Sequence, residues 1–173
     1  YAPGSVFKIV TTLAYMRQNS NYNDYSYDCT GSITEGDTTI PCAGGNVHGY
    51  EDLRSSFANS CNSSFANIGL QLDISGFRDT AEDLLFNSRL PGVLDYTKSS
   101  FVLDEDSPTS EIMMTAMGQG KTTVSPYHMT LITQAIANGG TLMEPYLVDS
   151  VTNYTGTEVR RNVPKSYARL MSS

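Results

Sequence analysis

Ser5 and Lys8, close to the start of the sequence, are residues whose types and spacing can do covalent chemistry. On a helix their three-residue spacing places both side chains on one face, within hydrogen-bonding reach. A serine hydroxyl is a poor nucleophile until a base accepts its proton, and a desolvated lysine can be neutral enough to serve. Apolar Val6 and Phe7 between them are expected to bury the site, and the helix start favours a developing oxyanion. Taken alone, the S-x-x-K spacing is more typical of a helix-capping serine and a surface lysine in the first turn. With the apolar flanking residues it predicts acyl transfer through Ser5 with Lys8 as its base.

A second group of chemically useful residues is the tripeptide Ser60-Cys61-Asn62. Apolar residues recur at helical spacing on both sides of it, so we expect the tripeptide on a turn between two helices. For Ser60 alone, the alternative reading is that its hydroxyl caps the helix that follows. Cys61 is interpreted as a packing residue, because no histidine accompanies it in a pattern typical of cysteine enzymes.

Hydrophobic periodicity and turn residues predict the elements that position these groups. The stretch 87–109 is expected to be a long irregular loop, and a loop of that length is often functional. The helix that begins near Pro126 should end at Asn138-Gly139-Gly140. We expect helices over 5–19, 51–59, 63–72, 76–85 and 126–138, short strands around 31–41, strands over 146–148 and 150–154, and another helix from about 160.

Charge and composition exclude several classes of protein. The formal net charge of the 173 residues is -7, without the clustered lysines and arginines that phosphate binding needs, which argues against nucleic acid as a partner. No run of eighteen apolar residues is present to span a bilayer. Because the sequence starts at Tyr1 without Met, we interpret it as a segment of a longer protein, so the absence of targeting signals says little about the native protein.

The cysteines and histidines do not match a metal-binding pattern in sequence. Cys29, Cys42 and Cys61 lack close pairing, and His48 and His128 stand alone, so no metal is expected. Cys29 and Cys42 bracket a turn-rich stretch that can fold as a hairpin and bring the two sulfurs together. Two interpretations stay open here, a disulfide between them or two half-buried thiols.

Three stretches together resemble the penicillin-binding proteins, and more the class B, monofunctional transpeptidases than class A. YAPGSVFKI at 1–9 is similar to the nucleophile motif, and Ile9 after the lysine favours class B. NVHGYEDLRSSFANSCN at 46–62 resembles the segment that ends in the second motif, S-x-N. MGQGKTTVSPYHMTLITQAIANGG at 117–140 resembles the G-Q-G stretch and the helix after it. The resemblance implies the α/β fold of β-lactamases and transpeptidases, of which this chain is mostly the helical part with few strands.

The resemblance also implies roles for the site residues. Ser5 would be the nucleophile, Lys8 its base, and Ser60 a relay of the proton towards the leaving amine. Asn62 would hold the substrate's peptide carbonyl or Lys8. The family's third motif, K-T-G or K-S-G on an edge strand, is missing, and Lys121 is rejected as its lysine because it lies in the G-Q-G loop. We therefore expect 1–173 to be a partial domain, incomplete at both ends and inactive in isolation.

The function that the resemblance implies is a peptidoglycan D,D-transpeptidase of wall growth and cell shape, without a cofactor. Stem peptides ending in D-Ala-D-Ala and β-lactams would acylate Ser5, on the extracytoplasmic face of the bacterial membrane. The parent would be membrane-anchored and work with other proteins of cell-wall synthesis. Two alternatives are a serine β-lactamase, whose glutamate base we do not find between 87 and 109, and a non-catalytic sensor or scaffold.

Overall fold

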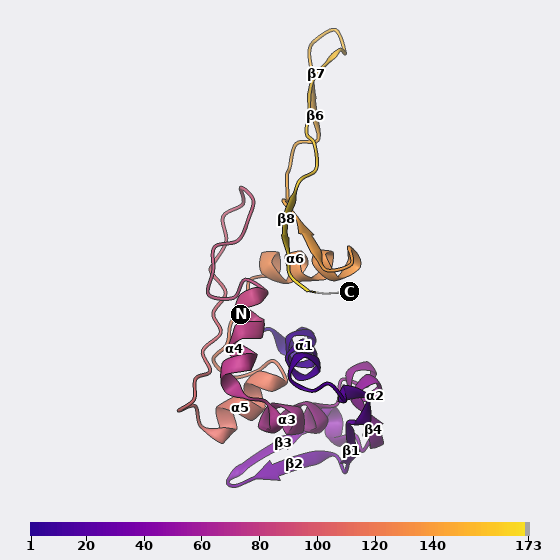
Figure 1. Ribbon diagram of the computed structural model, residues 1–173, viewed down its shortest axis with the longest axis vertical. Coiled ribbons are helices and arrows are strands. Elements are labelled where there is room, and N and C mark those ends of the chain that lie inside the picture. Colours follow the sequence, from indigo (N-terminus) through magenta and orange to yellow (C-terminus); the bar gives the residue numbers. More distant parts are fainter. Residues whose placement is uncertain (172–173) are drawn as a thin grey trace. The chain divides into compact units, whose positions relative to one another are not determined.

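The computed structural model describes residues 1–171 and divides them into two compact units (Figure 1). The first, here called the helical unit, comprises residues 1–88 and 99–124. The second, here called the hairpin unit, comprises residues 89–98 and the described residues from 125 onward. Among the described residues, no helix has the length and apolar character needed to cross a membrane.

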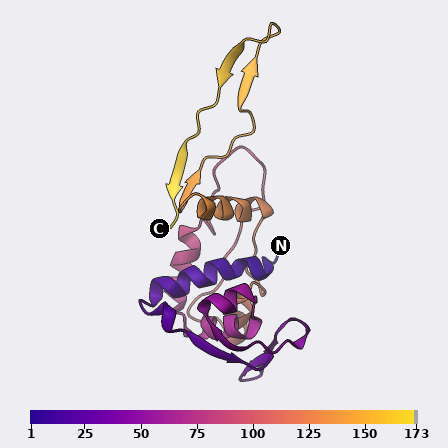
Figure 2. The same ribbon diagram turned by 90° about the vertical axis from the view of Figure 1, so that its right-hand side faces the viewer.

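Helices form most of the helical unit. Helix α1 packs against α4, and α3 packs against α5 (Figures 1 and 2). The predicted helices at 5–19, 51–59, 63–72 and 76–85 are thereby confirmed to within a few residues, whereas the helix at 109–116 was not expected. The helical elements are η1 (Gly4–Phe7), α1 (Lys8–Gln18), η2 (Tyr22–Asp24), η3 (Ala43–Gly45), α2 (Leu53–Ala58), α3 (Asn62–Gln71), α4 (Ile74–Asp83) and α5 (Thr109–Ala116).

Side chains at the helix starts explain why these helices begin where they do. Asp52 accepts the Ser55 backbone N–H at 2.6 Å while Ser55 Oγ accepts that of Asp52, which satisfies two donors that a helix start leaves free. Asp73 caps α4 through the N–H of Gly76. Helix α3 is capped by the sulfur of Cys61 and not by Ser60, so the capping interpretation of Ser60 is wrong.

Four short strands complete the helical unit. Strand β1 (Ser26–Cys29) pairs antiparallel with β4 (Gly49–Asp52), and β2 (Ser32–Glu35) pairs with β3 (Thr38–Pro41). The β2–β3 hairpin lies against α3, as Figure 1 shows. The strands expected around 31–41 are confirmed. Strands β1 and β4 were not expected, because each has only four residues and their partner is distant in sequence.

The hairpin unit consists of one helix and two pairs of strands (Figure 2). Helix α6 (Pro126–Ala137) begins with the Ser125 hydroxyl accepting the N–H of His128, and ends at Asn138. Gly139 and Gly140 follow with φ of 60° and 91°, as the sequence predicted. Strand β5 (Thr141–Met143) pairs with β8 (Ser166–Arg169), and β6 (Ser150–Thr152) pairs with β7 (Glu158–Arg161) in a ribbon.

Two predictions for the last thirty residues are wrong. The segment from 160 to 171 contains the end of β7 and all of β8, and no helix. Residues 172 and 173 of the predicted helix lie outside the described residues. Pro164 has no backbone N–H to give a helix, and the antiparallel partners β5 and β6 satisfy the backbone on either side of it. Residues 146–148 are irregular, and β6 ends at Thr152. The predicted α/β fold class itself is confirmed.

Candidate active site

Ser5 lies on the tight turn η1, where the chain enters helix α1. In a 3₁₀ turn the side chains at positions i and i+3 eclipse, so Ser5 and Lys8 share a face. The Lys8 backbone N–H is bonded to the Ser5 carbonyl, which closes this turn. Ser5 is exposed, and within residues 1–171 its hydroxyl has no hydrogen-bond partner. The predicted nucleophile is therefore accessible from solvent.

Phe7 attaches this turn to the hydrophobic core. Its ring is fully buried and meets the rings of Phe77, Phe86 and Phe101 at centroid distances between 5.6 and 6.3 Å. Aromatic rings carry most of the burial energy at such a cluster. Val6, in contrast, is 50% exposed, so the expectation that Val6 helps to bury the site is wrong. Of Val6 and Phe7, only Phe7 is buried in the core and holds the turn in place.

Lys8 is the centre of a buried polar cluster. Its side chain is 1% exposed, and Nζ donates to Ser60 O at 2.6 Å, Ser60 Oγ at 2.9 Å and Asn62 Oδ1 at 2.8 Å. Nζ also lies 5.3 Å from the centre of the Phe65 ring. The cluster joins three of the four predicted site residues. The hydrogen bond expected between Ser5 and Lys8 is not formed, because these oxygens already occupy the three ammonium donors.

Burial changes the acid–base behaviour of Lys8. Loss of water around the ammonium lowers the pKa of Lys8 from its ordinary value of 10.5 to about 8, although the nearby Cys61 and Cys42 oppose the shift. At pH 7 about a tenth of such a lysine is neutral, compared with well under a thousandth of an exposed one. Lys8 can thus exist as a free amine at physiological pH.

Ser60 adopts a backbone conformation that few residues other than glycine take. Its φ is 52°, in the left-handed region, which turns the chain sharply between α2 and α3. Glu51 holds the start of this turn, since its buried carboxylate accepts the Asn59 side-chain amide at 2.7 Å. The turn directs both the carbonyl and the hydroxyl of Ser60 to Lys8. Strain of this kind often marks a functional site.

The G-Q-G stretch approaches the nucleophile turn through its backbone. Gly4 N donates to Gly118 O at 2.8 Å, and a Cβ on Gly118 would lie 1.8 Å from the carbonyl oxygen of Gly4. Only glycine fits there, which explains this part of the motif. Lys121 lies in a turn, exposed, with its backbone N–H bonded to Glu111. This placement agrees with rejecting Lys121 as the lysine of a strand-borne K-T-G motif.

Sequence reasoning did not identify Glu51, Gly118 or Phe65 as parts of the site. In sequence, Glu51 and Phe65 resemble ordinary members of the two predicted helices, and no local signal distinguishes them. Gly118 had a usable signal, since it belongs to a glycine-rich stretch that the sequence singled out. Its contact with Gly4 joins residues 114 positions apart, which spacing alone does not reveal.

The three cysteines lie together beside this cluster, in contrast to the expectation from their spacing. Cys29 and Cys42 are free, with their sulfurs 3.6 Å apart, so the hairpin brings them together without a disulfide. Cys61 lies 3.7 Å from Cys42, sulfur to sulfur, and His48 also reaches the group. The view that the cysteines and His48 are isolated from one another was wrong, because the fold and not the sequence makes them neighbours.

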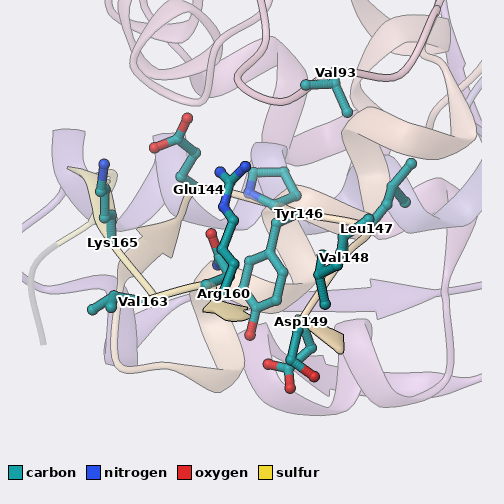
Figure 3. Close-up of a pocket in the computed structure, with 13 residues that line it drawn as sticks. Val93, Glu144, Tyr146, Leu147, Val148, Asp149, Arg160, Val163 and Lys165 are labelled. Atoms are coloured by element: carbon teal, nitrogen blue, oxygen red, sulfur yellow. The ribbon is translucent and has the colours of Figure 1, made fainter. Parts of the chain in front are cut away.

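One hollow lies in the hairpin unit and contains none of the predicted site residues. It has a volume of about 580 Å³ and is lined by Val93 and by residues between Glu144 and Lys165 (Figure 3). Glu144, Arg160 and Lys165 bring charges of both signs to it, beside the exposed Leu147. It contains no residue of the S-x-x-K or S-x-N motif, so the Ser5–Lys8 region is the better candidate for covalent chemistry.

Comparison with known proteins identifies relatives along the whole chain. A peptidoglycan D,D-transpeptidase PbpA of Mycobacterium tuberculosis is 31% identical over 156 residues, which are 87% of this chain and 31% of that protein. Stage V sporulation protein D of Bacillus subtilis is 29% identical over 182 residues, covering 99% of this chain and 27% of the relative. The chain thus spans about a third of the length of these relatives.

Solved structures give the same result. The ceftriaxone acyl-enzyme complex of penicillin-binding protein A from M. tuberculosis matches with a TM-score of 0.83 at 26% identity, over 99% of this chain and 39% of that one. The D,D-transpeptidase domain of a peptidoglycan glycosyltransferase from Eggerthella lenta matches with a TM-score of 0.83 at 26% identity, over 99% and 45%. The family described as penicillin binding protein transpeptidase domain matches residues 1–173. The chain therefore belongs to the penicillin-binding protein transpeptidase family.

Proposed function

We propose that the protein containing this chain is a serine D,D-transpeptidase that cross-links peptidoglycan. The observation that carries the proposal is the buried Lys8 amine, held by Ser60 and Asn62 and placed one turn after the exposed hydroxyl of Ser5. Acyl transfer through a serine needs a base that can be neutral near pH 7 and a nucleophile that a substrate can reach. The named activity of the PbpA relatives supports the same reaction.

In this reaction Ser5 Oγ attacks the carbonyl carbon of the penultimate D-Ala of a stem peptide. Lys8 accepts the hydroxyl proton and gives a proton to Ser60, which passes its own proton to the nitrogen of the terminal D-Ala as the C–N bond breaks. The stem remains bound to Ser5 as an ester. The amine of a neighbouring stem then attacks this ester, which forms the cross-link and returns the proton to Ser5. Asn62 orients Lys8 and the substrate's peptide carbonyl.

β-Lactams are proposed as inhibitors that acylate the same Ser5, as the relatives with acyl-enzyme structures support. Stem peptides in the wall lie outside the cytoplasmic membrane, so the proposed location is its extracytoplasmic face. The third motif and the membrane anchor of the parent protein are expected in its remaining residues. In isolation, residues 1–173 are expected to be inactive.

A fluorescent penicillin tests the proposal on the complete protein. We expect one stable covalent label on Ser5, complete loss of labelling in Ser5→Ala, and unchanged labelling in Ser20→Ala, which removes another exposed serine. Mass spectrometry of the labelled peptide identifies the site. Rapid release of the label would indicate a β-lactamase, and no label on a folded wild-type protein would indicate a sensor or scaffold. Either result would overturn the proposed reaction.

A further inference from the structure

Four potential metal ligands converge directly beside the Ser60-Cys61-Asn62 turn. They are the sulfurs of Cys29, Cys42 and Cys61 and a ring nitrogen of His48, all within 4.8 Å of one another. The three thiols are at most 3% exposed, and His48 closes the group as a half-buried side chain. A buried group of three sulfurs and one imidazole is an arrangement that soft divalent metals favour.

The distances match a tetrahedral site. Two thiolates each bonded at about 2.3 Å to a tetrahedral zinc are about 3.8 Å apart, and a sulfur and an imidazole nitrogen are about 3.5 Å apart. In this protein the Cys29–Cys42 and Cys42–Cys61 sulfurs are separated by 3.6 and 3.7 Å. Cys29 Sγ lies 3.3 Å from His48 Nδ1. The ligand atoms therefore need only small shifts to surround one ion.

Backbone hydrogen bonds hold the four segments in place without any ion. Antiparallel pairing of β1 with β4 sets Cys29 opposite Gly49, which brings His48 to it. Cys42 N donates to Gly31 O at 2.8 Å, and Cys61 N donates to Ser56 O at 3.0 Å. A site that the fold preorganises in this way pays little for ordering its ligands when a metal binds.

Hydrogen-bonding groups also lie beside the sulfurs. The Ser63 hydroxyl lies 3.2, 3.3 and 3.4 Å from the sulfurs of Cys29, Cys42 and Cys61. The backbone N–H of Ser64 donates to Cys61 Sγ at 3.5 Å. Donors next to metal-bound thiolates stabilise their negative charge and fix their orientation. Ser63 can donate to one of these sulfurs at a time, and the Ser64 N–H donates to Cys61.

We propose that Cys29, Cys42, His48 and Cys61 bind a zinc ion in a closed site with four protein ligands. A site with no open position serves structure and does not activate water. Zinc fits better than a disulfide, because a bond between any two of the sulfurs would leave the third thiol and the imidazole without a role. The Cys29–Cys42 and Cys42–Cys61 sulfur distances are nearly equal, which favours one ion bound by all three sulfurs over a disulfide between two of them.

The position of Cys61 gives this ion a consequence for the neighbouring cluster. Cys61 stands between Ser60 and Asn62, the two residues whose oxygens hold Lys8. A zinc–sulfur bond to Cys61 would fix the middle residue of the turn whose two outer residues hold Lys8. The metal ligands are then positioning residues for acylation, and this part of the inference rests on the proposed function, whereas metal binding itself does not.

The metal content of the complete, reduced protein tests the site directly. We expect about one zinc per chain after purification without added metal, measured by elemental analysis. After removal of zinc with a chelator, cobalt(II) should restore the site and give the intense visible bands and thiolate charge-transfer absorption of a tetrahedral thiolate complex. The probe is cobalt itself, so the readout does not depend on enzymatic activity.

Variants assign the ligands. His48→Ala and Cys29→Ser should reduce retained zinc to below about a tenth of an equivalent after dialysis against a chelator. Val47→Ala, at an exposed neighbour, should retain all of it, and His48→Cys should restore binding with a cobalt spectrum shifted by a fourth thiolate. No zinc and no cobalt spectrum in the reduced wild-type protein would overturn the proposal. So would a disulfide between two of the cysteines with no metal, or zinc that stays at one equivalent in both ligand variants.

Discussion

The two sides of the Ser60-Cys61-Asn62 turn differ in how much of each is visible in the sequence. On one side, Ser60 and Asn62 meet Lys8 in a polar cluster. On the other side, Cys61 meets Cys29, Cys42 and His48. The first cluster joins two short motifs, S-x-x-K and S-x-N, in which the spacing alone indicates that the two side chains of each motif can act together. The second joins single residues separated by 12, 5 and 12 others, which match no ligand spacing.

This difference shows that a functional motif can be recognised in a sequence when its residues lie in the same turn or helix. Ser5 and Lys8 share a turn, and Ser60 and Asn62 flank one residue, so local geometry is enough to pair them. The cysteines and His48 come together only after β1 pairs with β4 and Cys42 bonds to Gly31. Experiments that separate the two sides of the turn test whether they also have separate roles.

The largest effect is expected from Lys8. Lys8→Ala should leave a folded protein with acylation by a fluorescent penicillin lowered roughly 10²- to 10⁴-fold, because the proton acceptor of Ser5 is gone. Lys8→Arg should not restore the rate, since a guanidinium keeps its proton near neutral pH. Stopped-flow acylation rates measure both variants. An arginine variant that acylates at the wild-type rate would reduce Lys8 to an electrostatic anchor.

A smaller effect on acylation, with none on the metal, is expected from Ser60→Gly. Glycine accepts the positive φ of 52° without strain, so the change removes only the hydroxyl. Acylation should fall by about 10²-fold, the low end for a positioned acid–base group, while zinc content stays at the wild-type level. The matched change on the other side, Cys29→Ser, should lose zinc and slow acylation less. Loss of zinc in Ser60→Gly would show that the two sides are not separable.

The smallest effect concerns the helix that leads into the turn. Asp52→Ala removes the side-chain cap of α2 and should lower the free energy of unfolding by about 1 kcal/mol. Chemical denaturation of the complete protein measures the change, and Asp79→Ala, at an exposed position within α4, serves as the control. If both variants were equally stable, the cap would not contribute to holding the turn.

Local patterns predicted most of the helical unit, and non-local pairing explains most of the errors. Helix α6 was predicted from Pro126 to Asn138 because a proline, an apolar stripe and two glycines mark it locally. The segment after residue 160 was wrongly predicted as helix, since its strands form only through pairing with β5 and β6. Four exposed residues in β7 carry no alternation of apolar and polar side chains that would have indicated a strand.

The candidate site shows the same division. Its four residues were selected from sequence, and the structure joins Lys8, Ser60 and Asn62 by hydrogen bonds. Two details depended on packing that the sequence does not record. Val6 faces solvent. All three N–H donors of the Lys8 ammonium bond to oxygens of the Ser60-Cys61-Asn62 turn, so none is left for Ser5. Catalytic hydrogen bonds often tighten only when substrate is bound, so we expect the Ser5 to Lys8 contact to form in that state.

The pH dependence of Ser5 acylation tests the central claim, that Lys8 acts as a neutral base, most directly. Burial lowers the pKa of Lys8 to about 8, and the amine accepts a proton only when it carries none. Protonation therefore reduces the rate below this pKa. With a β-lactam whose own charge does not change, the acylation rate should rise about tenfold per pH unit from about pH 6 and level off above about pH 8. A rate that stays constant over this range, or that continues to rise to about pH 10.5, would contradict the account.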